Sequence, residues 1–261
     1  MLISHEVPIS MLEDSKSFND YDYCLLHLLN RPEYLDYYKK ASEQGRKVLL
    51  DNSLFELGDA MSPSRLLWGC DEIKPYWYVV PDAMNDTEKT IARFEDWKLN
   101  YRDKAYGLAI GVVQGSSFED LVRCYVYMAN NADKVAIPFL STAYQNMFPG
   151  IKNPLEKASL GRNYLIKYLM SKGLWKFDVP VHILGATLPG EFSDPIYGKY
   201  IESMDSSCPV VNGLIGKPIS IDTAEKPSVR LNDLIDEKVS DVQKELVLHN
   251  VEVFRNICEH N

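Results

Sequence analysis

The chain has 261 residues, of which 46% are hydrophobic and 25% are charged, and its net charge at pH 7 is −9. This composition is that of a globular domain and excludes a disordered chain, and the acidic balance disfavours indiscriminate binding to nucleic acid. No apolar run reaches the ~18 residues of a membrane span, and the N-terminus lacks a basic region followed by an apolar one. We therefore expect a cytoplasmic protein with no membrane partner.

Strand-like and helix-like stretches alternate along the chain without a linker. The expected strands are short apolar runs, and the expected helices begin at a serine, threonine, aspartate or proline. In chain order, the strand candidates are 1–7, 25–29, 47–51, 76–82, 107–115, 134–139, 179–187 and 200–205. The helix candidates are 32–45, a segment from 62 onward, 85–101, 116–131, 151–176 and 237–258.

This alternation predicts an α/β fold with a parallel sheet and right-handed crossovers. Seven or eight strand candidates favour a single (β/α)8 TIM-type barrel over residues 1–261, without a zinc-binding subdomain. No glycine-rich nucleotide-binding turn is present, which disfavours an open nucleotide-binding sheet. The segment 237–258 has apolar residues spaced by three, four and seven, so we expect an amphipathic helix that packs on the barrel. The loop 140–153 is the main irregular excursion.

The five cysteines are scattered, and none forms a C-x-x-C or C-x-C pair. This spacing disfavours a structural zinc site and a disulfide framework. We expect neither a metal nor another cofactor, and we expect most of the cysteines to be small buried hydrophobic residues.

Four polar side chains stand where an apolar run ends and a loop begins: Asp51, Asp82, Gln114 and Asp205. Chemistry in parallel α/β folds is placed at the carboxyl ends of the strands, so we expect these side chains to share one site. Two of these side chains could instead have purely structural roles. Asp51 could cap the turn that follows it, and Asp82 could belong to a turn that leads into a helix.

Neighbouring residues indicate what such a site could bind. Phe55 offers an aromatic platform for a planar ligand, and Gln114, followed by Gly115, carries an amide that can read the edge of a base. His182 and Leu184 lie two apart on one strand and thus on the same face. A lone histidine there is more often a hydrogen-bonded core residue than a catalyst.

Asp205 is followed by two serines and Cys208, which could donate hydrogen bonds that keep its carboxylate ionised, as suits a nucleophile. Cys208 ranks below Asp205 as a nucleophile because no histidine lies near it in the sequence. The segment 151–176 carries six basic side chains against one acidic side chain. It fits either a solvated helix face or a rim that contacts phosphates.

The series DNSLFE, VVPDAMND, GVVQGSSFEDLVRC, KVAIPF, HILGA and SMDSSC resembles, in this order, the barrel motifs of the tRNA-guanine transglycosylase superfamily. It is most similar to the shortened phage and bacterial members that act on DNA, and it spans residues 45–215. The resemblance implies a (β/α)8 barrel that exchanges a base in DNA for a 7-deazaguanine-type base through a covalent glycosyl-enzyme. It further implies DNA and a free purine or 7-deazapurine base as partners, inside a bacterial host cell, whether encoded by host or phage.

The resemblance implies a role for each residue of this sequence that matches a family motif. Asp205 matches the nucleophile that attacks the sugar C1′, and Asp51 matches the second carboxylate, which supports acid and base steps. Phe55 matches the aromatic residue that stacks on the base, with Leu184 on the other face of the base.

Asp82 and Gln114 match the residues that read the edge of the base. Gly115 and His182 complete the set of substrate-binding residues that we expect. The chain departs from the family where Ser53 replaces a glycine. Leu54 and Glu56 likewise replace a second glycine and a glutamine, and the zinc module is missing. The missing module removes a main argument for a tRNA substrate.

Three alternatives remain open from the sequence. The same carboxylates could serve a DNA glycosylase that passes the sugar to water, or the barrel could be a nucleic-acid-binding module without catalysis. A metal-dependent hydrolase would require a histidine cluster, for which His5, His27 and His182 are widely dispersed.

Overall fold

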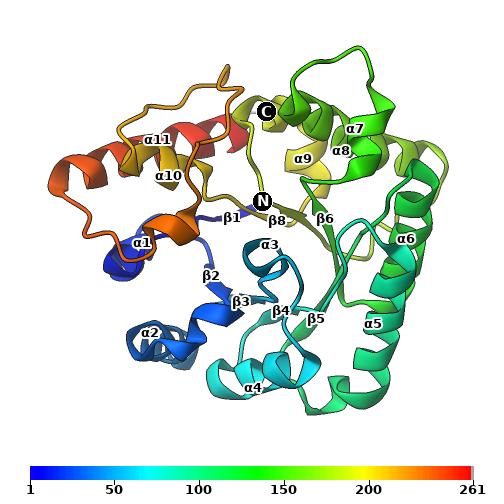
Figure 1. Cartoon of the computed structure of the whole chain (residues 1–261), viewed down its shortest axis with the longest axis horizontal. Coiled ribbons are helices and arrows are strands. Elements are labelled where there is room, and N and C mark those ends of the chain that lie inside the picture. The colour runs from blue at the N-terminus through cyan, green and yellow to red at the C-terminus, as the bar shows by residue number, and fades with distance from the viewer. Residues whose placement is uncertain (260–261) are drawn as a thin grey trace.

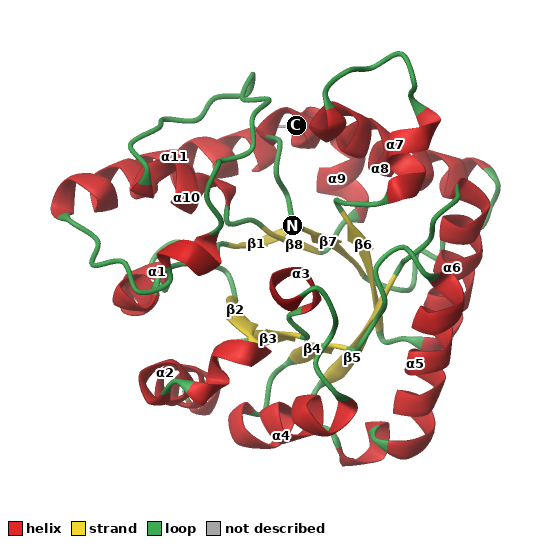
Figure 2. Ribbon diagram, in the orientation of Figure 1, coloured by secondary structure: helices red, strands yellow, loops and turns green. Residues whose placement is uncertain are grey.

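The computed structural model describes residues 1–259 and shows eight strands around one axis, with helices on the outside (Figures 1 and 2). The strands follow the order β1-β8-β7-β6-β5-β4-β3-β2, and every hydrogen-bonded pair is parallel. The backbone N–H of Asp20, just before β2, donates to the carbonyl of Ile3 in β1 (3.0 Å), so the barrel is nearly closed. The predicted (β/α)8 TIM-type architecture is confirmed; residues 260–261 of the predicted domain lie outside the described residues.

The strands are β1 Leu2–Ser4, β2 Asp22–Leu25, β3 Val48–Asp51, β4 Trp77–Val79, β5 Leu108–Val112, β6 Lys134–Pro138, β7 Val181–Leu184 and β8 Ser203–Asp205. The helices are α1 Leu12–Ser15, α2 Pro32–Glu43, α3 Leu54–Leu57, α4 Pro63–Ile73, α5 Thr87–Asn100, α6 Phe118–Asn131, α7 Thr142–Met147, α8 Pro154–Ser171, α9 Pro195–Tyr200, α10 Cys208–Leu214 and α11 Asp241–Glu259.

Side-chain caps explain why several helices begin where the sequence predicts. The side chain of Ser62 accepts the N–H of the third residue of α4, and Asp86 and Ser117 do the same for α5 and α6. Each cap satisfies an N–H that the helix itself leaves unpaired.

The expected strands are longer than the observed ones, and two expected elements are placed wrongly. The run 25–29 is mostly a 3-10 helix, Leu26–Asn30, and the second strand is the preceding Asp22–Leu25. The C-terminal helix begins at Asp241 and not at 237, because Ser240 caps it: the Ser240 Oγ accepts the N–H of Gln243, whose side chain accepts the Ser240 N–H. The expected loop 140–153 also contains α7.

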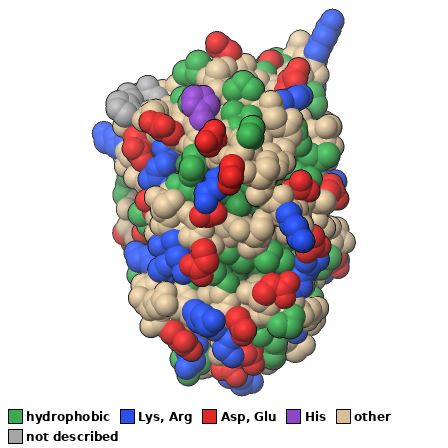
Figure 3. Space-filling view, turned by 90° about the vertical axis from the view of Figure 1, so that its left-hand side faces the viewer, with side chains coloured by type: hydrophobic (Ala, Val, Ile, Leu, Met, Phe, Trp, Pro, Cys, Tyr) green, Lys and Arg blue, Asp and Glu red, His purple; other side chains and the backbone are tan. Residues whose placement is uncertain are grey.

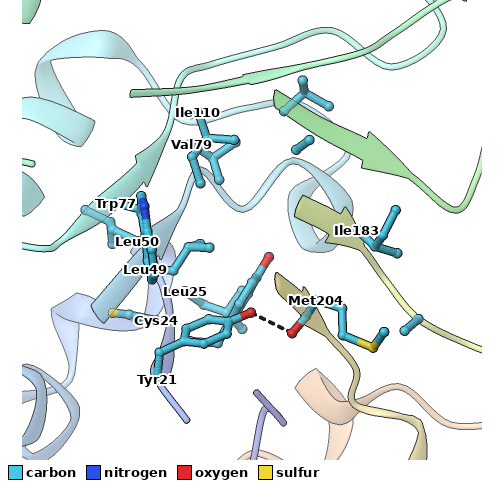
Figure 4. Close-up of a cluster of buried hydrophobic side chains, with 14 of the residues drawn as sticks. Tyr21, Cys24, Leu25, Leu49, Leu50, Trp77, Val79, Ile110, Ile183 and Met204 are labelled. Atoms are coloured by element: carbon cyan, nitrogen blue, oxygen red, sulfur yellow. Dashed lines mark hydrogen bonds between the residues drawn. The ribbon is translucent and has the colours of Figure 1, made fainter. Parts of the chain in front are cut away.

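The strands deliver buried apolar side chains to one core, among which Tyr21 donates from its hydroxyl to the Met204 carbonyl at 2.6 Å (Figure 4). This packing fills the barrel interior below its carboxyl end, as in other closed eight-stranded barrels. Any room for a ligand is therefore confined to the carboxyl ends of the strands.

The surface carries mixed charge. On the face in Figure 3, acidic and basic side chains are interspersed with apolar ones. In the basic segment 151–176, Arg162 of α8 is fully buried against Glu191 and Lys167 pairs with Asp194, so part of its charge is used within the fold. Within residues 1–259, no helix combines the length and apolarity that crossing a bilayer requires.

Candidate active site

A cavity of about 190 Å³ opens at the carboxyl ends of the strands. It exceeds the ~150 Å³ that encloses a benzene ring, so a planar heterocycle fits. All eight strands, or the loops that follow them, contribute to its wall. Six of the predicted residues line it: Asp51, Phe55, Asp82, Gln114, Leu184 and Asp205.

Asp205 ends β8 and is only 4% exposed. The backbone N–H of Gly185 lies 3.2 Å from each of its carboxylate oxygens, and His182 Nε2 lies 3.0 Å from Oδ1. The partners of the Asp205 carboxylate are therefore Gly185 and His182 and not the serine hydroxyl that follows, since Ser206 donates to the Ala186 carbonyl. Of the two carboxylate oxygens, Oδ2 has fewer protein partners.

Asp51 ends β3 and both lines the cavity and caps a turn. Its Oδ2 accepts the Ser53 N–H at 2.7 Å. Burial raises the pKa of Asp51 well above its usual value, and the Glu56 carboxylate raises it further. The environment of Asp51 therefore favours its protonated form more than that of an exposed aspartate does.

Ser53 adopts the left-handed conformation (φ 62°), which favours glycine. The Ser53 Oγ accepts the backbone N–H of His27 (3.1 Å) and contacts His27 Nδ1 (2.9 Å). These contacts hold the serine at a position where the motif resemblance expects glycine.

Asp82 and Gln114 form one buried network with Asn52, which sequence reasoning missed. Asn52 Nδ2 donates to Asp82 Oδ1 at 2.8 Å, and Gln114 Nε2 donates to Asp82 Oδ2 at 2.7 Å. The amide orientation of Gln114 is determined by Asn85, whose backbone N–H donates to Oε1 at 2.9 Å. The Gln114 side chain retains one N–H and one lone pair for a ligand.

Phe55 lies in α3, the short helix that follows β3, and Leu184 ends β7. Strands β3 and β7 are opposite each other in the eight-stranded barrel. The segment 226–232, in the irregular stretch between α10 and α11, also lines the cavity. From it, Lys226 Nζ and the Arg230 guanidinium lie 4.8 and 5.2 Å from the centre of the Phe55 ring. Two cations and an aromatic ring therefore share the cavity mouth.

Two further carboxyl groups line the cavity, Glu6 and Glu56. Burial raises the pKa of both, and the Asp205 carboxylate contributes to each shift. Glu6 follows β1, so the rule that selects polar residues at strand ends would have found it. The segment 226–232 carries no comparable sequence signal.

His182 and Gly115 do not line the cavity. His182 is fully buried behind Asp205. A side chain on Gly115 would collide with the backbone of Leu121 (2.8 Å), so this glycine permits the close approach of α6. Cys208 does line the cavity, but burial raises its pKa to about 11, which keeps the thiol protonated and a poor nucleophile.

Within residues 1–259, no group of three or more His, Cys, Asp or Glu side chains is arranged to hold a metal ion. His5 Nδ1 contacts the Ser206 carbonyl oxygen at 2.8 Å. In comparisons with known proteins, no family model and no curated sequence matches the chain.

Proposed function

We propose that this protein is a glycosyl-transfer enzyme that acts on the N-glycosidic bond of a base in DNA and replaces that base with a 7-deazaguanine-type base. The observation that carries the proposal is the pairing of two unlike carboxyl groups in one cavity. Asp205 accepts the Gly185 N–H and contacts His182, whereas burial and the Glu56 carboxylate raise the pKa of Asp51 well above its usual value. Unlike carboxyl groups divide the roles of nucleophile and acid.

The chemistry takes two displacements. In the first, an Asp205 oxygen forms a bond to the sugar C1′ while the C1′–N bond to the base breaks, and Asp51 gives its proton to the departing base. In the second, the incoming base returns a proton to Asp51 and its ring nitrogen attacks C1′, which releases Asp205. Oδ2 is the oxygen that attacks, because Oδ1 holds the His182 contact.

The base would stack between Phe55 and Leu184, with its edge on Asp82 and Gln114. A guanine-type edge presents N–H donors beside a carbonyl oxygen. The Asp82 carboxylate can accept from the donors, and the remaining N–H of Gln114 can donate to the carbonyl. The choice of a 7-deazaguanine-type base rests on the motif resemblance.

DNA as the substrate is supported by the cavity mouth. The cavity is too small for a base pair, so the target base must leave the stack. Lys226 and Arg230 form no ion pair within residues 1–259 and can bind a phosphate next to the extruded nucleotide. They supply local positive charge on a chain that is acidic in total.

The experiment supplies single- and double-stranded DNA with labelled guanine, together with free 7-cyano-7-deazaguanine. We expect guanine release, incorporation of the free base detected by nucleoside mass spectrometry, and a protein–DNA adduct on denaturing gels. Asp205→Asn should abolish all three, whereas Asp59→Asn, an exposed aspartate that pairs with Arg93, should retain them.

Normal base release by Asp205→Asn would remove the nucleophile assignment. Release without incorporation, with strands that break in alkali, would identify a DNA glycosylase instead. Failure of the wild type to release any base from DNA would refute the proposed function.

A further inference from the structure

A chain of hydrogen bonds runs through the barrel interior from Lys134 to Asp205. Lys134 is the first residue of β6 and is 1% exposed. Its Nζ donates to the Oγ of Ser203 and to the Glu202 carboxylate (2.6 Å). Ser203 Oγ lies 2.9 Å from His182 Nδ1, and His182 Nε2 lies 3.0 Å from Asp205 Oδ1.

Strand register brings these side chains together. His182 of β7 pairs with Ser203 of β8 and with Ala136 of β6. Lys134 lies two residues before Ala136 and Asp205 two residues after Ser203, so each shares a face with its neighbour along the strand. This series of hydrogen bonds therefore links the amino ends of the strands to the candidate active site.

The donors and acceptors determine the direction of each hydrogen bond. An ammonium group only donates, so Ser203 Oγ accepts from Lys134. Within the described residues the other hydrogen-bond partner of Ser203 Oγ is His182 Nδ1, so the buried hydroxyl proton is satisfied only if Nδ1 is the unprotonated nitrogen. His182 Nε2 consequently carries the proton and donates it to Asp205.

We propose that Lys134 is a positioning residue that holds His182 as the neutral Nε2–H tautomer, so that Asp205 Oδ1 accepts a hydrogen bond from His182 and Oδ2 is directed at the substrate. The tautomer is a property of the folded protein alone. Its consequence for catalysis rests on the proposed function.

The surroundings of His182 favour the neutral form. Burial lowers the pKa of His182, and the charge of Lys134 lowers it further, against the opposing effects of Asp205 and Glu202. The Tyr21 ring is the nearby aromatic neighbour, 6.4 Å away. Burial lowers the pKa of Lys134, and the Glu202 carboxylate opposes this shift. The Trp77 ring, 4.2 Å from Nζ, also favours the ammonium form.

The test is ¹⁵N nuclear magnetic resonance of histidine-labelled protein between about pH 5 and pH 8. We expect wild-type His182 to remain the neutral Nε2–H tautomer throughout. In Lys134→Met, Ser203 Oγ no longer accepts a hydrogen bond from the lysine and can accept one from a protonated Nδ1. His182 should therefore become doubly protonated at a higher pH than in the wild type. Lys47→Met is the matched control, because Lys47 is exposed and lies 5.3 Å from the same Trp77 ring.

Ser203→Ala keeps the Lys134–Glu202 pair and serves if Lys134→Met does not fold. In this variant the resonance of His182 Nδ1 should move to the position of a nitrogen that accepts no hydrogen bond. An Nδ1–H tautomer or an imidazolium in wild-type protein at neutral pH would overturn the proposal. So would titration of His182 in Lys134→Met identical to that in Lys47→Met.

The catalytic consequence is measured separately. Lys134→Met should lower kcat for base release about 10- to 100-fold with little change in KM, as for other residues that orient a reacting group through a neighbour. An altered tautomer with unchanged kcat would refute the catalytic part. Absence of base release by the wild type would refute the proposed function and leave the tautomer result standing.

Discussion

The buried ion pair behind the cavity wall yields a sharp prediction about stability. Arg162 of α8 is fully buried, and it donates from Nε and Nη2 to the two oxygens of Glu191 at 2.8 and 2.9 Å. Its Nη1 donates to the carbonyl of Leu184 at 2.9 Å, and Glu191 also accepts from the Tyr197 hydroxyl at 2.6 Å. Arg162→Met removes all of the arginine bonds and leaves the Glu191 charge without its cation.

We expect Arg162→Met to lower the free energy of unfolding by about 3–5 kcal/mol, because an uncompensated buried charge remains. Adding Glu191→Gln removes that charge but keeps an oxygen for Tyr197, so the double variant should recover about 2 kcal/mol or more. Lys167→Met is the matched control on the same helix. Its pair with Asp194 involves a lysine side chain that is 53% exposed, and its loss should cost at most about 1 kcal/mol.

Urea unfolding at one fixed pH measures these three variants and Glu191→Gln alone, with the free energy obtained from midpoint and slope. The reasoning is refuted if Arg162→Met costs no more than Lys167→Met. It is also refuted if the double variant loses the sum of the two single losses, since that result would mean that the pair carries no coupling.

Three other predictions concern the proposed activity. The pKa of Asp51 is raised, and its acid form is lost as the pH rises through this raised pKa. The value of kcat/KM for base release should therefore fall at alkaline pH. Asp51→Asn should reduce base release by about 10²- to 10⁴-fold and should remove the alkaline fall from the pH profile. Gln114→Glu keeps the acceptor for Asn85 but loses the N–H to the base, so guanine release should fall about 10- to 100-fold, and equal release by variant and wild type would make Gln114 structural. Replacing Lys226 and Arg230 by alanine should reduce the slope of log K against log salt for single-stranded DNA by about 1.4, and an unchanged slope in binding titrations would exclude phosphate contacts there.

The parallel sheet explains which parts of the site could be predicted from the sequence. In such a sheet all carboxyl ends meet at one face, so a polar residue after an apolar run has a predictable place. Asp51, Asp82, Gln114 and Asp205 follow this rule, and the structure brings them to one cavity. Glu6 follows it too, but the first strand was expected to continue to residue 7 and actually ends at Ser4.

What the sequence could not provide depends on contacts between distant segments. Asn52 reads as an ordinary loop residue until Asp82 is placed 2.8 Å from it. Lys134 reads as a surface lysine at the start of a strand, and only strand register reveals that it reaches Ser203 inside the barrel. The stretch between α10 and α11 has no periodicity that would predict its course over the cavity.

That covering stretch bears on the choice between base exchange and hydrolysis. A glycosyl ester on Asp205 persists until either a base or a water attacks C1′, and Asp205 is only 4% exposed. The cover is held to the barrel on one side by Asn232, whose Oδ1 lies 3.0 Å from His27 Nε2, and by the ion pair between Arg31 and Asp236. In the proposed mechanism, the burial of Asp205 and the wall formed by residues 226–232 limit water at C1′, which favours transfer to a second base over transfer to water.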